Sequence, residues 1–255
     1  MTMTVKELQI IEYVCQTHLN IYDSPKCDRL ATQAAKGRNL RVVSQEDAAI
    51  AVCLCEDDYP GWLLRSDVGK LQVATQAYQA QLVAEAEIRT FIPQVIAFTQ
   101  AAMQQPNYYL WGGSVGPNYD CSGLIQAAFA SVGVWLPRDA YQQEAFALAI
   151  TVEEMIPGDL VFFGVEKATH VGLFLGDGCY IHSSGEKMGR NGIGIDRLSE
   201  QGDAVSRSYY QQLRGAGRVV ESYTGARGAS SAVREVGCVR RCPPLSKPTV
   251  RFPLL

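Results

Sequence analysis

The segment THVGLFLGDGCYIHSSG, residues 169–185, constrains the fold most, because it reads as two strands joined by a tight turn. A three-residue Gly-Asp-Gly loop predicts that Leu175 pairs with Cys179. With this pairing, His170 and His182 become diagonal neighbours on one face of the hairpin, with α-carbons about 7–8 Å apart and their rings within reach. A two-residue Asp-Gly turn would place them on opposite faces, and we adopt the three-residue loop.

The order of the remaining elements predicts an α+β chain with a small all-β part in front. Residues 9–73 contain several short β runs between turn signals, which favours a small barrel. Residues 74–89 are rich in Ala, Gln and Glu and are expected to be helical or a helical linker. Pro93 suits the first turn of a helix that runs to about Gln104.

A second helix is expected to begin near Cys121. Its apolar residues recur at helical spacing, and they are Leu124, Ile125, Ala128, Phe129 and Val132. Five strands are expected after it, at residues 160–164, 169–176, 179–184, 193–197 and 215–220. Helices followed by an antiparallel sheet are typical of an α+β domain.

Charge and hydropathy exclude several classes of function. The formal net charge is −3, and the basic residues after Tyr223 hide a more acidic body, which argues against nucleic-acid binding. No apolar run approaches the roughly 18 residues of a membrane helix, and the start MTMTVKELQI has no features of a secretory signal. We therefore expect a cytoplasmic monomer that binds neither nucleic acid nor membrane.

The cysteines do not form a metal-binding pattern. There are eight of them at irregular spacing, and Cys53 and Cys55 form a C-x-C pair without a matching Cys/His pair at the spacing that zinc requires. We expect neither a metal ion nor a cofactor.

Cys121 stands between Asp120 and Ser122 at the start of the apolar helix, where it could be a structural thiol, a metal ligand or a nucleophile. The helix start favours a thiolate by only about 1 kcal/mol, so a nucleophile also needs a base. A cysteine on an apolar helix is more often a small core residue. Two of the three histidines share one hairpin, however, which favours a Cys-His site with His170 as the base and His182 as the group that orients it.

Five motifs, in this order and spacing, resemble those of the NlpC-type cysteine peptidases of bacteria; they are YYLWGG, DCSGLIQAAF, LPRDAYQQ, PGDLVFF and THVGLFLGDGCYIHSSG. The resemblance covers about residues 106–220, and the part in front resembles a bacterial SH3-like domain. It implies a papain-like fold and activity on peptidoglycan stem peptides. The combination is similar to the cyanobacterial γ-D-glutamyl-L-diamino acid endopeptidases, which act on free, recycled cell-wall peptides.

This resemblance implies roles for individual residues. Cys121 would be the nucleophile, His170 the base and His182 the residue that orients it. Backbone N–H groups at the helix start, including that of Cys121, would stabilise the oxyanion. A pocket for the free N-terminal amine of the substrate would consist of Tyr59, Trp111, Asp120, Ser122 and Asp139.

The chemistry of this pocket is reasonable, although three of its residues also have a structural alternative. Asp120 and Asp139 would supply carboxylates to an ammonium group. Tyr59 and Trp111 would supply aromatic walls. Alternatively, Asp120 caps the helix, Tyr59 is a turn aromatic and Asp139 is a surface acid. Ala140 stands where some relatives place a serine, a departure that bears on one substrate hydrogen bond.

Composition and the resemblance together predict the organisation of the chain, with the tail lying outside the resemblance. The expected parts are an SH3-like domain at 1–75, a helical linker and the first catalytic helix at 76–104, a catalytic domain at 105–222, and a basic Gly/Ser/Pro tail without fixed structure at 223–255.

The reaction implied is hydrolysis of the bond between the γ-carboxyl of D-Glu and meso-diaminopimelate or Lys, in peptides with a free L-Ala terminus, during cell-wall recycling. Two alternatives remain. An amidase or acyltransferase would use Cys121 and His170 on another acyl substrate, and a non-catalytic wall-binding protein would rely on the SH3-like domain.

Overall fold

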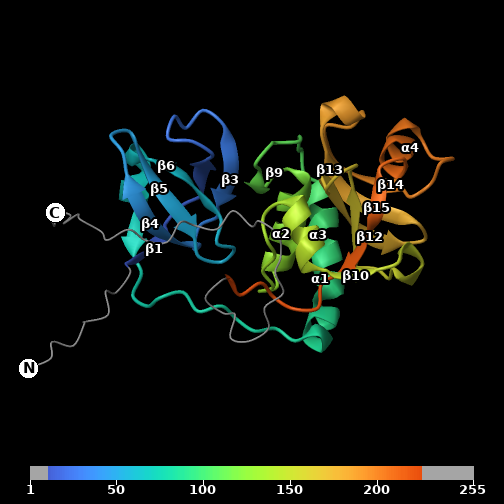
Figure 1. Cartoon of the computed structure of the whole chain (residues 1–255), viewed down its shortest axis with the longest axis horizontal. Coiled ribbons are helices and arrows are strands. Elements are labelled where there is room, and N and C mark those ends of the chain that lie inside the picture. Colours follow the sequence, from blue (N-terminus) through green and yellow to red (C-terminus); the bar gives the residue numbers. More distant parts are fainter. Residues whose placement is uncertain (1–10, 226–255) are drawn as a thin grey trace, which may run out of the picture.

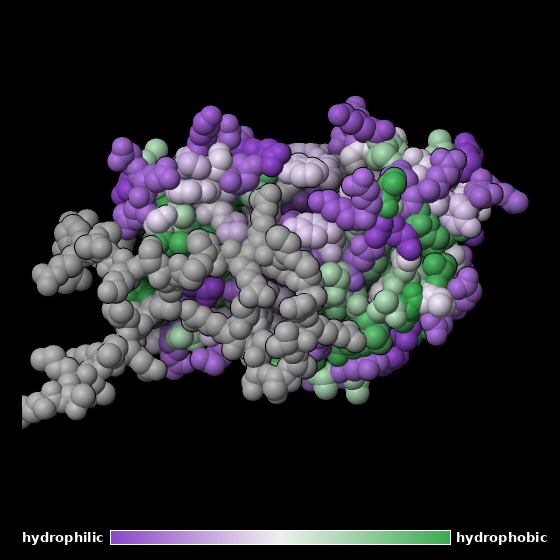
Figure 2. Space-filling model, viewed as in Figure 1, coloured by the Kyte–Doolittle hydropathy of each residue, from purple (hydrophilic) through white to green (hydrophobic). Residues whose placement is uncertain are grey.

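The computed structural model describes residues 11–225, which form two parts that lie side by side, each built around its own sheet (Figure 1). Most of the tail predicted at 223–255 lies outside the described residues. Among residues 11–225, no helix has the length and apolar character needed to cross a bilayer. On the face seen in Figure 2, hydrophilic residues line the upper edge over both parts.

Seven short strands form the sheet of the first part, in the spatial order β3-β2-β6-β5-β4-β1-β7. The elements are β1 (Glu12–Cys15), β2 (Leu19–Tyr22), β3 (Leu30–Ala34), β4 (Asn39–Gln45), β5 (Ala49–Leu54), β6 (Pro60–Leu64), the 3-10 helix η1 (Arg65–Lys70) and β7 (Leu71–Val73). Their inward side chains, such as Ile21, Leu40 and Leu63, form an apolar core of their own. The small all-β part expected from the sequence is confirmed.

Helix α1 (Glu85–Met103) begins well before Pro93, so the prediction that Pro93 lies in its first turn is wrong. Residues 74–84 have no helix, and the Ala/Gln-rich segment is helical only in its last part. Pro93 and Arg89 are both exposed, so water can satisfy the Arg89 carbonyl that loses its helical partner. The opposite face of α1 packs on the core, and this packing stabilises the helix despite the proline inside it.

The second part contains a six-stranded antiparallel sheet in the order β10-β15-β11-β12-β13-β14. Its strands are β10 (Leu148–Ile150), β11 (Leu160–Phe163), β12 (His170–Gly176), β13 (Cys179–Ser184), β14 (Gly192–Arg197) and β15 (Leu213–Arg218). Two short strands, β8 (Ser114–Val115) and β9 (Asn118–Tyr119), pair separately, and short 3-10 helices follow at η2 (Val152–Glu154) and η3 (Glu186–Met188). All five expected strands are present, whereas β10 was not predicted.

Helices cover both faces of this sheet. On one face α1, α2 (Cys121–Ala130) and α3 (Ala140–Phe146) share an apolar core with the inward side chains of the strands. On the other face α4 (Ala204–Tyr210) packs on a smaller cluster that contains Phe163 and Tyr180. This layered α+β arrangement confirms the predicted fold class and places the start of α2 next to β12.

The hairpin of β12 and β13 has the predicted register through its body. Leu173 pairs with Ile181, the pairing that the sequence analysis requires for His170 and His182 to share a face. In agreement with it, the two histidine rings contact each other, with centroids 4.9 Å apart.

The turn of this hairpin differs from the prediction. Gly176 pairs with Cys179, so the loop has only two residues, Asp177 and Gly178, with φ of 50° and 69° as in a type I′ turn. A register shift between Phe174 and Gly176 places one extra residue in β12. This bulge compensates for the shorter loop, so the predicted pairing holds although the predicted loop length is wrong.

Buried hydrogen bonds connect the two parts of the chain. Gln126 of α2 donates from Nε2 to Asp57 at 2.9 Å, and Arg138 donates from Nε to the Thr32 hydroxyl at 2.7 Å. All four side chains are buried, so separating the parts would expose or leave unpaired several polar groups. The barrel is therefore fixed against the helices that carry the candidate site.

Candidate active site

Cys121 is the first residue of α2, and its side chain lies against β12. The backbone N–H groups of Val171 and Ser122 lie close to its sulfur. Since Val171 directly follows His170, the thiol lies beside the histidine predicted to be the base.

The turn before α2 holds the cysteine in place. Asp120 caps the helix by accepting a hydrogen bond from the N–H of Gly123 at 2.6 Å. Gly123 has no room for a side chain, because a Cβ there would overlap the carbonyl oxygen of Gly113. The same oxygen accepts a hydrogen bond from the backbone N–H of Asp120 at 3.0 Å. The start of α2 thus packs directly on the backbone of the YYLWGG motif.

The resting state of Cys121 is the thiol. Burial raises the pKa of Cys121 to about 12, and the negative charge of Asp120 adds to this effect. The N–H groups of Val171 and Ser122 and the charge of Arg138 oppose the rise without reversing it. The position at the helix start was expected to favour a thiolate, and burial outweighs that contribution.

A line of hydrogen bonds runs away from the thiol through two histidines and an aspartate. Nε2 of His170 and Nδ1 of His182 are 2.6 Å apart, and Nε2 of His182 is 2.6 Å from Oδ2 of Asp196. Because Nε2 of His170 is used in this line, Nδ1 is the ring nitrogen available to Cys121. The structure therefore brings together the three residues predicted as nucleophile, base and orienting group.

Both histidines are neutral at pH 7. Burial lowers the pKa of His170 well below its usual value, and the neighbouring His182 lowers it further. Burial also lowers the pKa of His182, an effect that the hydrogen bond to Asp196 offsets in part. A neutral imidazole beside a neutral thiol is the pair from which general-base catalysis starts.

Asp196 and Arg190 were not among the site residues predicted from the sequence. Burial tends to raise the pKa of Asp196, but hydrogen bonds from His182 and Arg190 outweigh it and lower that pKa. Arg190 donates from Nη2 and Nε to the two carboxylate oxygens at 2.5 and 3.1 Å. The signal available was strand alternation, since Asp196 shares a face of β14 with Gly194, the residue paired with His182.

Asp120 is paired with a buried arginine in addition to capping α2. Arg138 donates to its two carboxylate oxygens at 3.0 and 2.7 Å, and the backbone N–H of Gly112 donates to Oδ2 at 2.9 Å. Arg138 also donates to the hydroxyl of Ser122 at 3.0 Å. One guanidinium therefore anchors two of the predicted pocket residues, Asp120 and Ser122. The capping alternative for Asp120 is confirmed.

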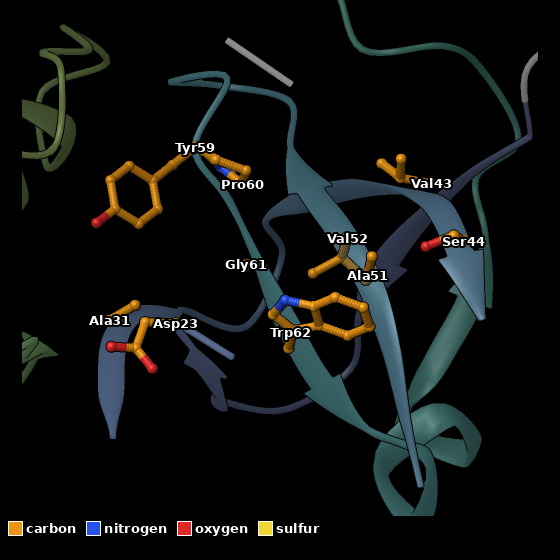
Figure 3. A pocket seen from close by; sticks show the side chains of 10 residues that line it. All are labelled: Asp23, Ala31, Val43, Ser44, Ala51, Val52, Tyr59, Pro60, Gly61 and Trp62. Carbon is orange, nitrogen blue, oxygen red and sulfur yellow. The ribbon is translucent and has the colours of Figure 1, made fainter. Parts of the chain in front are cut away.

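Tyr59 of the barrel reaches the catalytic part. Its hydroxyl donates to Oδ1 of Asp139 at 3.4 Å, across the boundary between the two parts. Figure 3 shows the ring of Tyr59 directed away from Trp62, which lines the pocket on the barrel surface. Tyr59 and Asp139 are thus neighbours, as the predicted amine pocket requires.

Three further aromatic residues surround the site. Trp111 is 63% exposed, so most of its ring is open to a ligand. Burial raises the pKa of Tyr109, and the acidic groups Cys121 and Asp120 raise that pKa further, which places this phenol near both. Tyr209 of α4 stacks on His170 with centroids 4.3 Å apart. Neither Tyr109 nor Tyr209 was predicted from the sequence as a site residue.

The arrangement is suited to acyl transfer. It provides a nucleophile, an adjacent base with an oriented ring, and helix N–H groups that have no intrahelical acceptor. Within residues 11–225, no cluster of three or more His, Cys, Asp and Glu side chains is placed to hold a metal ion.

Two family models match the chain. Residues 106–214 match the NlpC/P60 family, and residues 21–68 match the bacterial dipeptidyl-peptidase Sh3 domain. These ranges correspond to the two parts seen in the structure.

Curated relatives match mainly over short stretches. The bifunctional muramidase/DL-endopeptidase CwlT of Bacillus subtilis is 43% identical over 30% of this chain and 25% of its own. The γ-D-glutamyl-L-lysine dipeptidyl-peptidase of the same organism is 40% identical over 29% of this chain and 27% of its own. Dipeptidyl-peptidase 6 of Lysinibacillus sphaericus is 40% identical over 36% of this chain and 32% of its own. The matches span about a quarter to a third of each relative's length.

Among solved structures, an NlpC/P60 family protein from Bacillus cereus is 23% identical with a TM-score of 0.45, over 83% of this chain and 64% of that chain. The two family matches carry the assignment: the chain contains an NlpC/P60 domain preceded by a bacterial dipeptidyl-peptidase SH3 domain.

Proposed function

We propose that the protein is a cysteine peptidase that cleaves the bond between the γ-carboxyl of D-Glu and the diamino acid of peptidoglycan stem peptides. Its substrate carries a free N-terminal L-Ala, and the diamino acid is meso-diaminopimelate or Lys. The observation that carries this proposal is the line of Cys121, His170 and His182 in the same domain as Asp139, which Tyr59 of the barrel contacts. Relatives named γ-D-glutamyl-L-lysine dipeptidyl-peptidase support the choice of bond.

In the first half of the reaction, Sγ of Cys121 attacks the γ-carbonyl carbon of D-Glu while its proton passes to Nδ1 of His170. The carbonyl electron pair moves onto oxygen, and the N–H of Cys121 at the helix start donates to this oxyanion. When the intermediate collapses, the imidazolium of His170 returns the proton to the leaving amine of the diamino acid. A thioester remains on Cys121.

In the second half, His170 accepts a proton from water as that water attacks the thioester. Collapse of the second intermediate releases the γ-carboxyl of D-Glu and returns the proton to the sulfur of Cys121. The cycle requires His170 to be unprotonated at Nδ1 at the start of each half.

Recognition of the free amine rests on Tyr59 and Asp139. The charge of Asp120 is already compensated by Arg138, so Asp139 is the carboxylate proposed to contact the ammonium. Trp111 would form a wall of this subsite, and Ser122 would position Arg138 beside it. Ala140 offers a methyl group and no hydroxyl, so the subsite has one polar contact fewer than a serine there would give.

A requirement for a free amine favours peptides already released from the wall. We therefore place the reaction in cell-wall recycling in the cytoplasm, with the monomer acting on small peptides. Intact strands, in which the L-Ala nitrogen is amidated, would be poor substrates because they lack the ammonium group.

The test is a mass-spectrometric digest of L-Ala-γ-D-Glu-meso-diaminopimelate beside its N-acetylated form, with wild type and Cys121→Ala in parallel. We expect the wild type to cleave only the free peptide and the variant to cleave neither. Equal cleavage of both peptides would support the peptidase activity and refute the proposed recognition of the free amine. No cleavage by the wild type would favour an amidase or acyltransferase on another acyl substrate, or a wall-binding role.

A further inference from the structure

The side chain of Asp196 ends the hydrogen-bond line on the side away from the thiol. It is 1% exposed, and the His182 ring beside it is fully buried. Tyr180 and Tyr209 pack against that ring, with centroids 4.8 and 5.0 Å away. Water therefore has no access to Nε2 of His182, and Asp196 alone determines what this nitrogen bonds to.

The ionised carboxylate of Asp196 can only accept hydrogen bonds. The 2.6 Å contact therefore requires the proton of neutral His182 to lie on Nε2, which leaves Nδ1 of that ring as an acceptor. His170 must then donate to it from Nε2 across their 2.6 Å contact. The lone pair of His170 is consequently on Nδ1, the nitrogen that the contact with His182 leaves available to Cys121.

The two histidines alone do not determine this result. Their hydrogen bond forms equally well in the reverse direction, with His182 donating from Nδ1 to Nε2 of His170. In that state His170 would carry its proton on Nδ1 and could not accept one from Cys121. Asp196 is the group that distinguishes the two states.

Arg190 holds the carboxylate in this role. Its two hydrogen bonds to Asp196 fix the direction of both carboxylate oxygens, and the positive charge of the guanidinium favours the ionised form of Asp196. Gly194 gives the guanidinium its space, since a Cβ there would overlap Nη1 of Arg190. The arrangement is thus built from three residues of one short segment.

We propose that Asp196, held by Arg190, is a positioning residue that sets the tautomers of His182 and His170 and thereby makes Nδ1 of His170 the base for Cys121. The proposal rests on the proposed function, because it explains how that site acquires its base.

The test uses ¹⁵N-labelled histidine in the full-length chain. The sequence has only three histidines, and the spectrum of His18→Gln identifies the third ring. Two-bond ¹H–¹⁵N correlations at pH 7.5 report which nitrogen carries the proton. We expect both His170 and His182 to be protonated at Nε2 in the wild type, and a wild-type spectrum with the His170 proton on Nδ1 would overturn the proposal.

In Asp196→Asn, an amide oxygen is expected to face Arg190 while the NH₂ group donates to His182, so both rings should shift to the Nδ1 proton. The rate of Cys121 alkylation by iodoacetamide, and kcat on the free peptide, should fall about 100-fold or more while KM is unchanged. Asp177→Asn, in the exposed turn of the same hairpin, should change none of these values. An Asp196→Asn protein that keeps the wild-type tautomers and alkylation rate would also overturn the proposal.

The wild-type spectrum needs neither a folded variant nor a substrate. If the wild type shows the expected tautomers and cleaves no stem peptide, the proposed substrate fails and the role of Asp196 stands. If it cleaves the peptide with the reverse tautomers, only the role of Asp196 fails.

Discussion

The barrel and the catalytic part both bury charged side chains, but the two buried networks end at different places. In the barrel, Arg38 pairs with Glu56 and Asp57, and Asp57 accepts a hydrogen bond from Gln126 of the catalytic part. This network ends at the contact between the two parts. It holds the barrel in place and contains no group beside the thiol.

In the catalytic part the buried networks converge on the start of α2. Arg138 orders Asp120 and Ser122 on both sides of Cys121, and the histidine line begins at His170, whose chain neighbour Val171 lies next to the same sulfur. Burial is costly for all these groups, and buried ion pairs stabilise little by themselves. The difference shows that a buried polar network indicates function only when it terminates at a reactive atom, and four predictions test that distinction.

The largest expected effect is on the base. His170→Ala should lower kcat/KM on the free stem peptide by about 10⁴-fold, because the thiol then has no proton acceptor. His18→Ala, which changes the exposed histidine of the barrel, should leave kcat/KM within about twofold of the wild type. An equal loss in both variants would mean that the barrel takes part in the chemistry and would break the comparison.

The second prediction compares one arginine from each network. Arg138→Met and Arg38→Met should each lower the free energy of unfolding by about 3–5 kcal/mol, because each leaves buried carboxylates without their partner. Only Arg138→Met should also raise KM for the free peptide, since Asp120 and Ser122 lose their anchor. Urea unfolding and steady-state kinetics at 15 °C measure the two effects.

A control for the second prediction is Arg138→Met/Asp120→Asn, in which the unpaired charge is gone. It should recover part of the lost free energy of unfolding, whereas KM for the free peptide should stay raised. If Arg38→Met raised KM as much as Arg138→Met, the barrel network would not be only structural.

The sequence predicted the site best where strand geometry decides the outcome. The pairing of β12 with β13 follows from side-chain alternation, so the sequence alone was enough to place His170 and His182 on one face. Alternation could not determine the length of the loop. A two-residue type I′ turn with a bulge gives the same strand pairing as a three-residue loop, and the three-residue loop was the wrong choice.

Other features depend on contacts between residues far apart in the chain, which no local pattern reveals. The anchoring of Asp120 by Arg138 and of Arg138 by Thr32 joins three segments. The start of α1 was predicted too late for a related reason, since packing on the core overrides the usual meaning of Pro93. Asp196 lay in a predicted strand, yet its role depends on which strand pairs with which.

The third prediction concerns pH, and it separates the two parts because the buried histidines lie only in the catalytic part. The folded-state pKa of both His170 and His182 is lowered by burial, so their contribution to stability is complete above the unfolded value of about 6.5 and is lost as pH falls below it. Each can cost up to about 1.4 kcal/mol per pH unit.

Urea unfolding at pH 7.5 and 5.5 measures this loss. The double variant His170→Gln/His182→Gln should lose clearly less stability than the wild type over the same interval. An identical loss in both proteins would show that other groups determine the acid sensitivity.

The smallest expected effect tests Tyr59, a barrel side chain that contacts Asp139 of the predicted amine pocket. Tyr59→Phe keeps the ring and removes the hydroxyl that donates to Asp139, so kcat/KM for the free peptide should fall about fivefold, the equivalent of one hydrogen bond of about 1 kcal/mol. Tyr13→Phe, on the barrel strand β1, should have no effect on either the free or the N-acetylated peptide. A larger loss for Tyr59→Phe, confined to the free peptide, would show that the barrel helps to select the substrate as well as holding its place beside α2. No loss at all would mean that Asp139 recognises the amine without the Tyr59 hydroxyl and that the Tyr59 ring only lines the subsite. The barrel would then have a purely structural role, and all polar recognition would belong to the catalytic part.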